Sequence, residues 1–254
     1  MNLITNSKLS GIQPCWADFR GFTLLFDNPG ASLSQQGSLE YVTVDPNLLF
    51  YQVLNSTLQQ FKAELTGHYL FFALAPHSYH VTACDGGNVD NLACVKATHR
   101  DALKDFLEDL PESIGQANSF AECVNKSELL AKRDWKIRLE FDSLANWSDV
   151  SIVACLRPTD TEAAEQLDQF TEARRQLCTA LQTSFAINPS ATFVPHVTLG
   201  YFANCEYGQR TRSQIDKWQA VFSQAMANLS ISFSSISLYG FTDMETFFRR
   251  SLRL

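Results

Sequence analysis

Residues 193–202 read Phe-Val-Pro-His-Val-Thr-Leu-Gly-Tyr-Phe, and the central His-Val-Thr recurs at residues 80–82. The chain has five histidines, and two of them, His80 and His196, begin this motif. In a β-strand, residues i and i+2 point to the same face, so each histidine projects beside its threonine while the valine turns into the core. Each motif therefore offers an imidazole that exchanges protons near neutral pH, next to a hydroxyl that can hydrogen-bond a phosphate oxygen.

The residue pattern around the motifs predicts alternating strands and helices. Runs of β-branched and aromatic residues, or strict alternation of apolar and polar residues, predict strands. Apolar residues at helical spacing predict helices. The first of these helices is expected to begin at Asp45-Pro46 and to end at Gly67. The predicted strands cover residues 21–26, 41–44, 68–74, 78–84, 135–142, 150–156, 193–202, 231–239 and 245–254. The predicted helices cover residues 46–66, 98–110, 158–184 and 213–229.

Each half of the chain contains a helix, a strand with His-Val-Thr, a second helix and a further strand. This order predicts an α+β protein made of two related lobes that meet near residues 143–149. We expect residues 1–254 to form a single bilobal domain. Its parts are an N-terminal extension at 1–45, a first lobe at 46–145 and a second lobe at 146–254.

Composition and charge limit the classes of partner. The net charge is −7 and the pI is about 5.2, so the average surface repels long duplex nucleic acids but leaves room for a small nucleotide or a strand end. The seven cysteines form no C-x-x-C pair, which is typical of reduced thiols. No signal peptide, membrane-spanning run or nucleotide-binding loop is recognisable. We expect a cytoplasmic monomer that has no membrane contact and needs no cofactor.

The two segments resemble the paired signatures of the 2H phosphoesterase superfamily, which includes 2′,3′-cyclic phosphodiesterases and bacterial 2′-5′ RNA ligase-like proteins. The first copy, followed by Ala-Cys-Asp-Gly, is more similar to an uncharacterised bacterial branch. The likeness spans residues 46–254 in element order but only about twenty residues in motif detail. The chain departs from the family in the 113 residues between the motifs and in its N-terminal forty residues, which we expect to build a cap.

The resemblance implies a bilobal fold of two antiparallel-sheet lobes with outer helices, related by pseudo-two-fold symmetry. It makes His80 and His196 the general acid and base, and Thr82 and Thr198 the ligands of the scissile phosphate, with no metal required. The near symmetry leaves open which histidine is the base.

Other side chains near the motifs have competing interpretations. Tyr201 is a candidate for stacking a substrate base. We expect Phe202 to pack in the core and Tyr79 to face away from His80. Cys84 shares the parity of the first motif and so could line the cleft, although packing is the default role of such a thiol.

A metal site is disfavoured. His77, His80 and Asp85 are close in sequence, but strand geometry sends His77 and His80 to opposite faces. Cations are needed to attract a phosphate, and nothing in the sequence ranks the candidates. These are Lys96, Arg100, Lys136, Arg138, Arg157 and Arg210.

These observations lead to one main hypothesis and two alternatives. The main hypothesis is a metal-independent phosphoesterase that hydrolyses a small cyclic phosphate, or a 2′-5′ or terminal RNA phosphodiester, in RNA processing. One alternative is a non-catalytic module on the same fold that binds a nucleotide or phosphorylated ligand. The other is a scaffold with accidental motifs, which predicts that the two histidines lie far apart.

Overall fold

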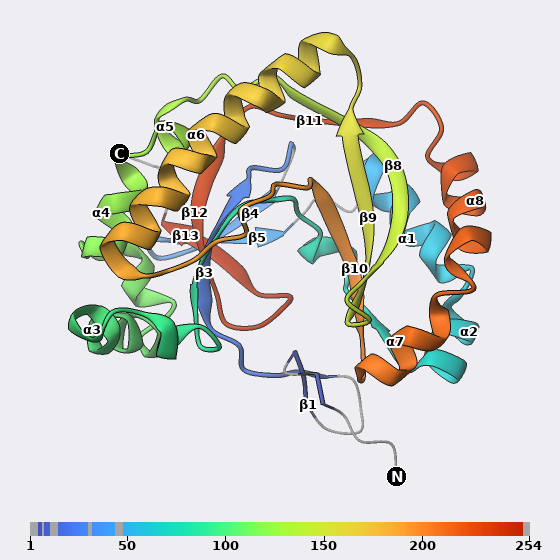
Figure 1. Cartoon of the computed structure of the whole chain (residues 1–254), viewed down its shortest axis with the longest axis horizontal. Coiled ribbons are helices and arrows are strands. Elements are labelled where there is room, and N and C mark those ends of the chain that lie inside the picture. The colour runs from blue at the N-terminus through green and yellow to red at the C-terminus, as the bar shows by residue number, and fades with distance from the viewer. Residues whose placement is uncertain (1–4, 7, 11–14, 30–31, 44–47, 251–254) are drawn as a thin grey trace.

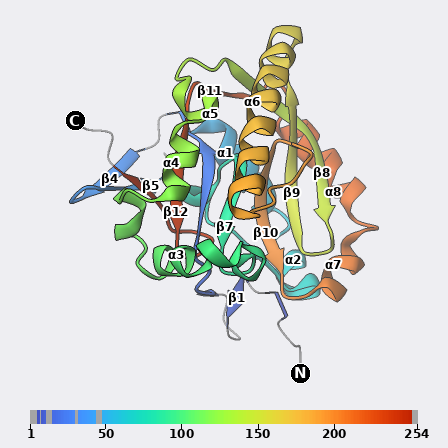
Figure 2. The ribbon, with the colours of Figure 1, turned by 60° about the vertical axis from the view of Figure 1, so that its left-hand side comes forward.

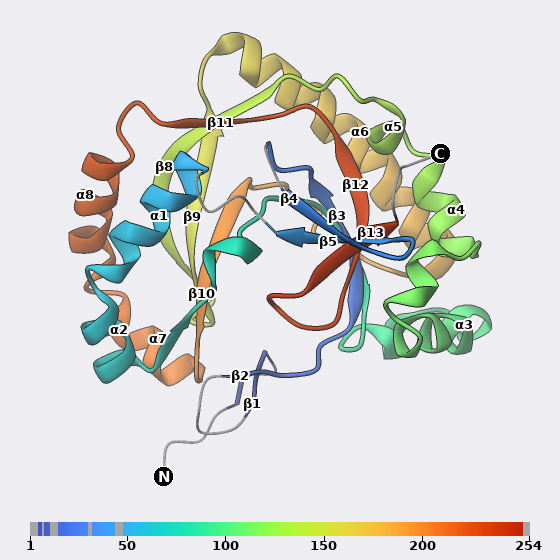
Figure 3. The same ribbon diagram turned by 180° about the vertical axis from the view of Figure 1, so that it is seen from behind.

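Two antiparallel sheets form the centre of the protein and face each other, with helices outside both (Figures 1 and 3). The computed structural model describes residues 5–6, 8–10, 15–29, 32–43 and 48–250. The five-stranded sheet has the order β11 (Ser230–Phe233), β8 (Ile137–Trp147), β9 (Ser151–Pro158), β10 (His196–Phe202) and β6 (Phe71–Ala73). The six-stranded sheet has the order β4 (Ser32–Gln36), β5 (Leu39–Thr43), β13 (Phe247–Arg250), β12 (Ile236–Phe241), β3 (Gly21–Phe26) and β7 (Thr82–Asn88). A separate pair joins β1 (Leu9–Ser10) to β2 (Cys15–Trp16).

The helices form two groups, one for each sheet (Figures 1 and 2). On the side of the five-stranded sheet lie α1 (Leu49–Gln59), α2 (Lys62–Tyr69), α7 (Cys205–Thr211) and α8 (Ile215–Ala225). On the side of the six-stranded sheet lie α3 (Ala97–Glu108), α4 (Ser119–Asn125), α5 (Glu128–Ala131) and α6 (Thr161–Phe185). Together with the two antiparallel sheets, this arrangement confirms the predicted bilobal α+β fold. None of the helices in the described part of the chain is both long and apolar enough to cross a membrane.

Local sequence explains the most regular elements. All six residues of β3 are buried, and on one face Phe22 packs against α3 and Phe26 against α6. In β8 the predicted alternation is confirmed in its first half, where Ile137 and Leu139 are buried and Arg138 and Glu140 are less so. Helix α6 begins at an Asp160 N-cap, whose carboxylate accepts a hydrogen bond from the backbone of Ala163 at 2.9 Å.

Several predicted boundaries are wrong. The predicted helix at 46–66 is two helices, separated at Gln60 and Phe61, and its proposed Asp45-Pro46 start lies outside the described residues. The predicted strand at 231–239 is two strands in different sheets, β11 and β12, joined by residues 234–235. The short helices α4, α5 and α7 were not predicted. Apolar periodicity does not reveal where a chain crosses from one sheet to the other.

The predicted division into successive lobes does not coincide with the sheets. The six-stranded sheet takes β3, β4 and β5 from the expected extension, β7 from the first lobe, and β12 and β13 from the second lobe. The expected junction at 143–149 lies within a β-hairpin, where β8 turns into β9. Ser148 and Asp149 both have positive φ, of 52° and 60°, as in the tight turns that match the twist of a hairpin. Pairing between strands that are far apart in sequence therefore decides which sheet each strand joins, and the order of the elements along the chain does not.

Candidate active site

The two His-Val-Thr motifs meet through a backbone bridge between the start of β7 and β10. Val81 and Val197 form an isolated antiparallel bridge between them, and both valine side chains are fully buried. Antiparallel pairing places the residue before one valine opposite the residue after the other. The bridge therefore directs His80 toward Thr198 and Thr82 toward His196, so the motifs face each other in a local two-fold arrangement.

Both imidazoles are oriented by the same backbone contact. Nδ1 of His80 lies 2.7 Å from the carbonyl oxygen of Ser78, and Nδ1 of His196 lies 2.9 Å from that of Val194. A carbonyl oxygen only accepts hydrogen bonds, so Nδ1 carries the proton in each neutral ring. Nε2 is thereby left as the basic nitrogen in both motifs, and it is the atom available for proton transfer.

An aromatic ring supports each histidine. Phe247 packs edge-on against His80 with 4.6 Å between ring centroids, and Trp147 packs against His196 at 4.1 Å. These contacts restrict rotation of the imidazoles in addition to the backbone hydrogen bonds. The two half-buried rings are therefore held in one orientation before any ligand arrives.

Burial makes both imidazoles weak bases. It lowers the pKa of His80 to about 4, with a smaller contribution from the nearby His196, and the Ser78 carbonyl opposes the shift. Burial also lowers the pKa of His196, but there the Val194 carbonyl and the negative charge of Asp85 oppose it. The negative charge of Asp85 therefore favours the protonated form of His196.

A cavity of about 180 Å³ opens between the sheets at the motifs. His80, Thr82, Thr198 and Tyr201 line it, whereas His196 lies outside its lining and is placed by the valine bridge. The structure therefore brings the four predicted motif residues and the predicted aromatic residue together.

Tyr201 is held by contacts on several sides. Its hydroxyl lies 3.6 Å from Sδ of Met244, and its ring packs edge-on against Trp16 with 6.0 Å between ring centroids. Burial raises the pKa of the phenol to about 12, so it stays protonated at neutral pH. The phenol thus reaches the same space as the Thr198 hydroxyl.

The cavity has a cation that the sequence did not indicate. Lys8 lines it, and its ammonium group lies over the ring of Phe19. Burial lowers the pKa of Lys8 to about 7, although Asp90 and Asp85 oppose the shift. None of the six cations considered from the sequence lines this cavity. Lys8 belongs to the N-terminal segment, which has no motif by which it could have been singled out.

A bulge in β7 changes which side chains face the cavity. The consecutive residues Leu24 and Leu25 of β3 pair with Cys84 and Thr82, so Ala83 is an extra residue. The idea that Cys84 lines the cleft with Thr82 is therefore wrong. Asp85 lines the cavity instead, and Cys84 points to α6, where its Sγ lies 3.7 Å from that of Cys178.

A buried arginine holds this bulge in place. The side chain of Arg174, on α6, donates from Nε to the carbonyl of Ala83 at 2.9 Å and from a terminal nitrogen to that of Ser190 at 2.7 Å. It is only 3% exposed. Within the described residues, no group of three or more His, Cys, Asp and Glu side chains is placed to hold a metal ion.

Comparisons with known proteins support the fold. No family model and no curated protein sequence matches the chain. A conserved protein of unknown function from Agrobacterium tumefaciens, Atu0111, is similar in structure with a TM-score of 0.56 and 13% identity, over 96% of this chain and 89% of that one. LigT of E. coli has a TM-score of 0.43 and 15% identity, over 94% of this chain and 98% of its own. Usb1 of Kluyveromyces marxianus has a TM-score of 0.39 and 11% identity, over 92% and 98%. The chain therefore shares its bilobal fold of two antiparallel sheets with the Agrobacterium protein.

Proposed function

We propose that the protein is a metal-independent phosphoesterase of the 2H type. Its substrate is a small cyclic phosphate, or a 2′-5′ or terminal RNA phosphodiester. The observation that carries the proposal is the Val81–Val197 bridge, which sets two histidine–threonine pairs face to face with Nε2 of each ring available. A cytoplasmic monomer that acts in RNA processing is part of the same proposal.

In this proposal the threonine hydroxyls and Lys8 bind the phosphate. Thr82 and Thr198 donate hydrogen bonds to its non-bridging oxygens, and the Lys8 ammonium offsets its negative charge. The protein carries a net charge of −7, so a local cation is needed to concentrate an anionic ligand. The cavity of about 180 Å³ fits a phosphate with its immediate substituents rather than a duplex.

Hydrolysis then needs one base and one acid on opposite sides of the phosphorus. We assign the base to His80, whose Nε2 accepts a proton from water as the water oxygen bonds to phosphorus. We assign the acid to His196, whose Nε2–H gives a proton to the leaving ribose oxygen as the P–O bond breaks. The assignment follows from Asp85, which favours the protonated form of His196. Binding of an anionic phosphate favours this imidazolium further.

Single substitutions test the assignment. His80→Ala and His196→Ala should each lower kcat by about 10²–10⁴-fold on 2′,3′-cyclic nucleotides, the usual contribution of general acid–base catalysis. His77→Ala removes an exposed histidine three residues from the motif and is the matched control. EDTA should leave the rate unchanged. Wild-type rates in either active-site variant, or inhibition by EDTA, would disprove the mechanism.

The nature of the leaving group separates the acid from the base. A p-nitrophenyl phosphodiester has a leaving group that needs little protonation, so it should largely restore the rate of His196→Ala but not that of His80→Ala. Restoration in the opposite variant would reverse the two roles.

A non-catalytic module that binds a phosphorylated ligand is the second candidate. Burial lowers the pKa of both imidazoles and so favours this candidate, because a neutral ring that carries its proton on Nδ1 has no proton on Nε2 to donate. This candidate predicts binding of cyclic phosphates and 2′-5′ dinucleotides without turnover across the whole panel.

A further inference from the structure

Two cysteines that are far apart in sequence meet between a strand and a helix. Cys84 lies on β7 and Cys178 lies on α6, 94 positions later, and their Sγ atoms are 3.7 Å apart. Both are free thiols. The sulfur atoms of a disulfide bond are about 2.0 Å apart, so these two atoms need to approach by less than about 2 Å to form one.

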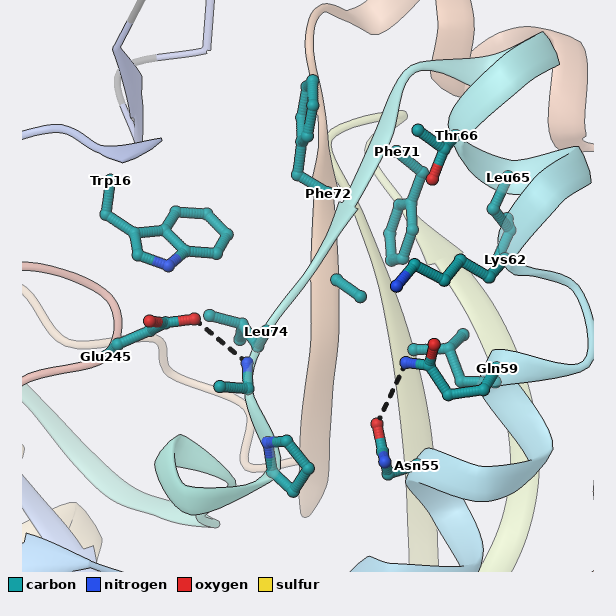
Figure 4. A pocket seen from close by; sticks show the side chains of 14 residues that line it. Trp16, Asn55, Gln59, Lys62, Leu65, Thr66, Phe71, Phe72, Leu74 and Glu245 are labelled. Carbon is teal, nitrogen blue, oxygen red and sulfur yellow. Dashed lines mark hydrogen bonds between the residues drawn. The ribbon is translucent and has the colours of Figure 1, made fainter. Parts of the chain in front are cut away.

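This thiol pair is separate from the cavities of the protein. Neither cysteine is among the residues that line the motif cavity. A larger cavity, of about 650 Å³, lies next to α1, α2 and β6 on the side of the five-stranded sheet (Figure 4). The thiol pair lies on the side of the six-stranded sheet, where α6 packs. The role of the pair is therefore a question independent of the proposed function.

The folded chain holds the two sulfur atoms in contact. Arg174, one turn before Cys178 on α6, donates from Nε to the carbonyl of Ala83, the residue before Cys84, at 2.9 Å. Leu177, the neighbour of Cys178, is buried in the core and fixes the same turn of the helix. The thiols consequently meet in the native structure, without any need for local unfolding.

The two thiols differ in exposure and in proton affinity. Cys178 is half-buried, whereas Cys84 is only 1% exposed. The hydrogen-bond contact with Cys84 lowers the pKa of Cys178 to about 7, and the Arg174 cation acts in the same direction, against desolvation. The same contact, together with burial, raises the pKa of Cys84. Cys178 is therefore the thiolate that a reagent from solvent can meet, and Cys84 is the thiol that keeps its proton beside it.

We propose that Cys84 and Cys178 form a modification site, at which a hydroperoxide such as hydrogen peroxide joins β7 to α6 through a disulfide bond. The Cys178 thiolate attacks one oxygen of the peroxide, the O–O bond breaks, and hydroxide leaves with Cys178 as a sulfenic acid. The Cys84 sulfur then attacks the Cys178 sulfur, the S–O bond breaks, and the leaving hydroxide takes the Cys84 proton. Two thiols lose two electrons in total. One peroxide becomes two molecules of water, the first with the proton that Cys178 released on ionisation.

The disulfide locks α6 onto the strand that begins at the first motif. Because the cross-linked positions are 94 apart in sequence, the bond strongly restricts the unfolded chain. Thr82 and Asp85, on the same strand as Cys84, line the motif cavity. Oxidation therefore stabilises the wall that carries these two residues.

Peptide mass spectrometry of the full chain tests the disulfide. The reduced wild-type protein is treated with a small excess of hydrogen peroxide, blocked with N-ethylmaleimide and digested without reductant. We expect a cross-linked Cys84–Cys178 peptide to be the main disulfide product and to disappear after treatment with dithiothreitol. Absence of this peptide, or preferential pairing of other cysteines, would overturn the proposal.

Serine variants separate the roles of the two thiols. In Cys84→Ser the sulfenic acid of Cys178 has no partner, so dimedone, which labels sulfenic acids, should label Cys178 several-fold more than in wild type. In Cys178→Ser, Cys84 should stay reduced. Cys155→Ser removes a buried thiol on β9 and is the matched control, which should form the Cys84–Cys178 bond as wild type does. Equal labelling of Cys178 in wild type and Cys84→Ser would contradict the role of Cys84.

Thermal unfolding tests whether the native fold accepts the bond. The Tm of the oxidised wild type should exceed that of the reduced protein by about 10 °C, as expected for a closed loop of this length in a chain of this size. Peroxide should produce the same shift in Cys155→Ser and none in Cys84→Ser. An unchanged or lower Tm after oxidation of the wild type would show that the bond does not lock α6 onto β7. None of these measurements depends on hydrolysis, so failure of the proposed function leaves this inference standing.

Discussion

Acidification should destabilise this protein in a way that can be traced to His80. The pKa of this residue is about 4 in the folded protein, against about 6.5 for an unperturbed histidine. Between pH 4 and 6.5, His80 therefore binds a proton in the unfolded chain but not in the folded protein. The resulting stabilisation is fully present above about pH 6.5 and is lost as the pH falls toward 4. A difference of about 2.5 pH units corresponds to about 3 kcal/mol.

Urea unfolding followed by circular dichroism at several pH values between 7.5 and about 4 provides the measurement. Wild type should lose stability more steeply than His80→Gln, because the variant has no imidazole to protonate. The gap between the two free energies of unfolding should change by about 3 kcal/mol across this range. Thr82→Val, which alters the same cavity without removing a titrating group, should keep the wild-type slope. If the free energies of unfolding of wild type and His80→Gln changed equally with pH, the lowered pKa of His80 would be refuted.

Three further predictions concern Lys8, Arg174 and Cys178. Lys8→Met should raise the Kd of inorganic phosphate about tenfold at pH 6. The affinity of the wild type should fall between pH 6 and 8, because a lysine with a pKa of about 7 loses its charge in this range. The affinity of the variant should depend less on pH. Arg174→Met should lower the free energy of unfolding by about 2–4 kcal/mol, because two backbone carbonyls lose their donor, and an effect below about 0.5 kcal/mol in urea unfolding would contradict this. The contact with Cys84 lowers the pKa of the Cys178 thiol to about 7. Cys178 should therefore react with iodoacetamide at pH 7 faster than the exposed Cys205, as measured by peptide mass spectrometry. Equal rates would contradict a lowered pKa.

Local sequence was enough to find the motif residues and most of the regular elements. The offset of two between histidine and threonine depends only on the alternation of a strand, and it places His196 and Thr198 on one face of β10. The Asp160 cap and the apolar stripe of α6 are also short-range signals, and the helix begins and ends within a few residues of its predicted limits. The repeated order of elements around two equal motifs was enough to predict the bilobal fold.

Other features depend on contacts between residues far apart in the chain. The partners of β7 could not be deduced from its own sequence, and neither could the bulge at Ala83 that turns Cys84 away from the cavity. The lowered pKa values arise from burial and neighbouring charges, which exist only after the two sheets come together. Lys8 enters the site for the same reason. Periodicity records which face of an element is buried, whereas the make-up of a cavity depends on which distant faces meet.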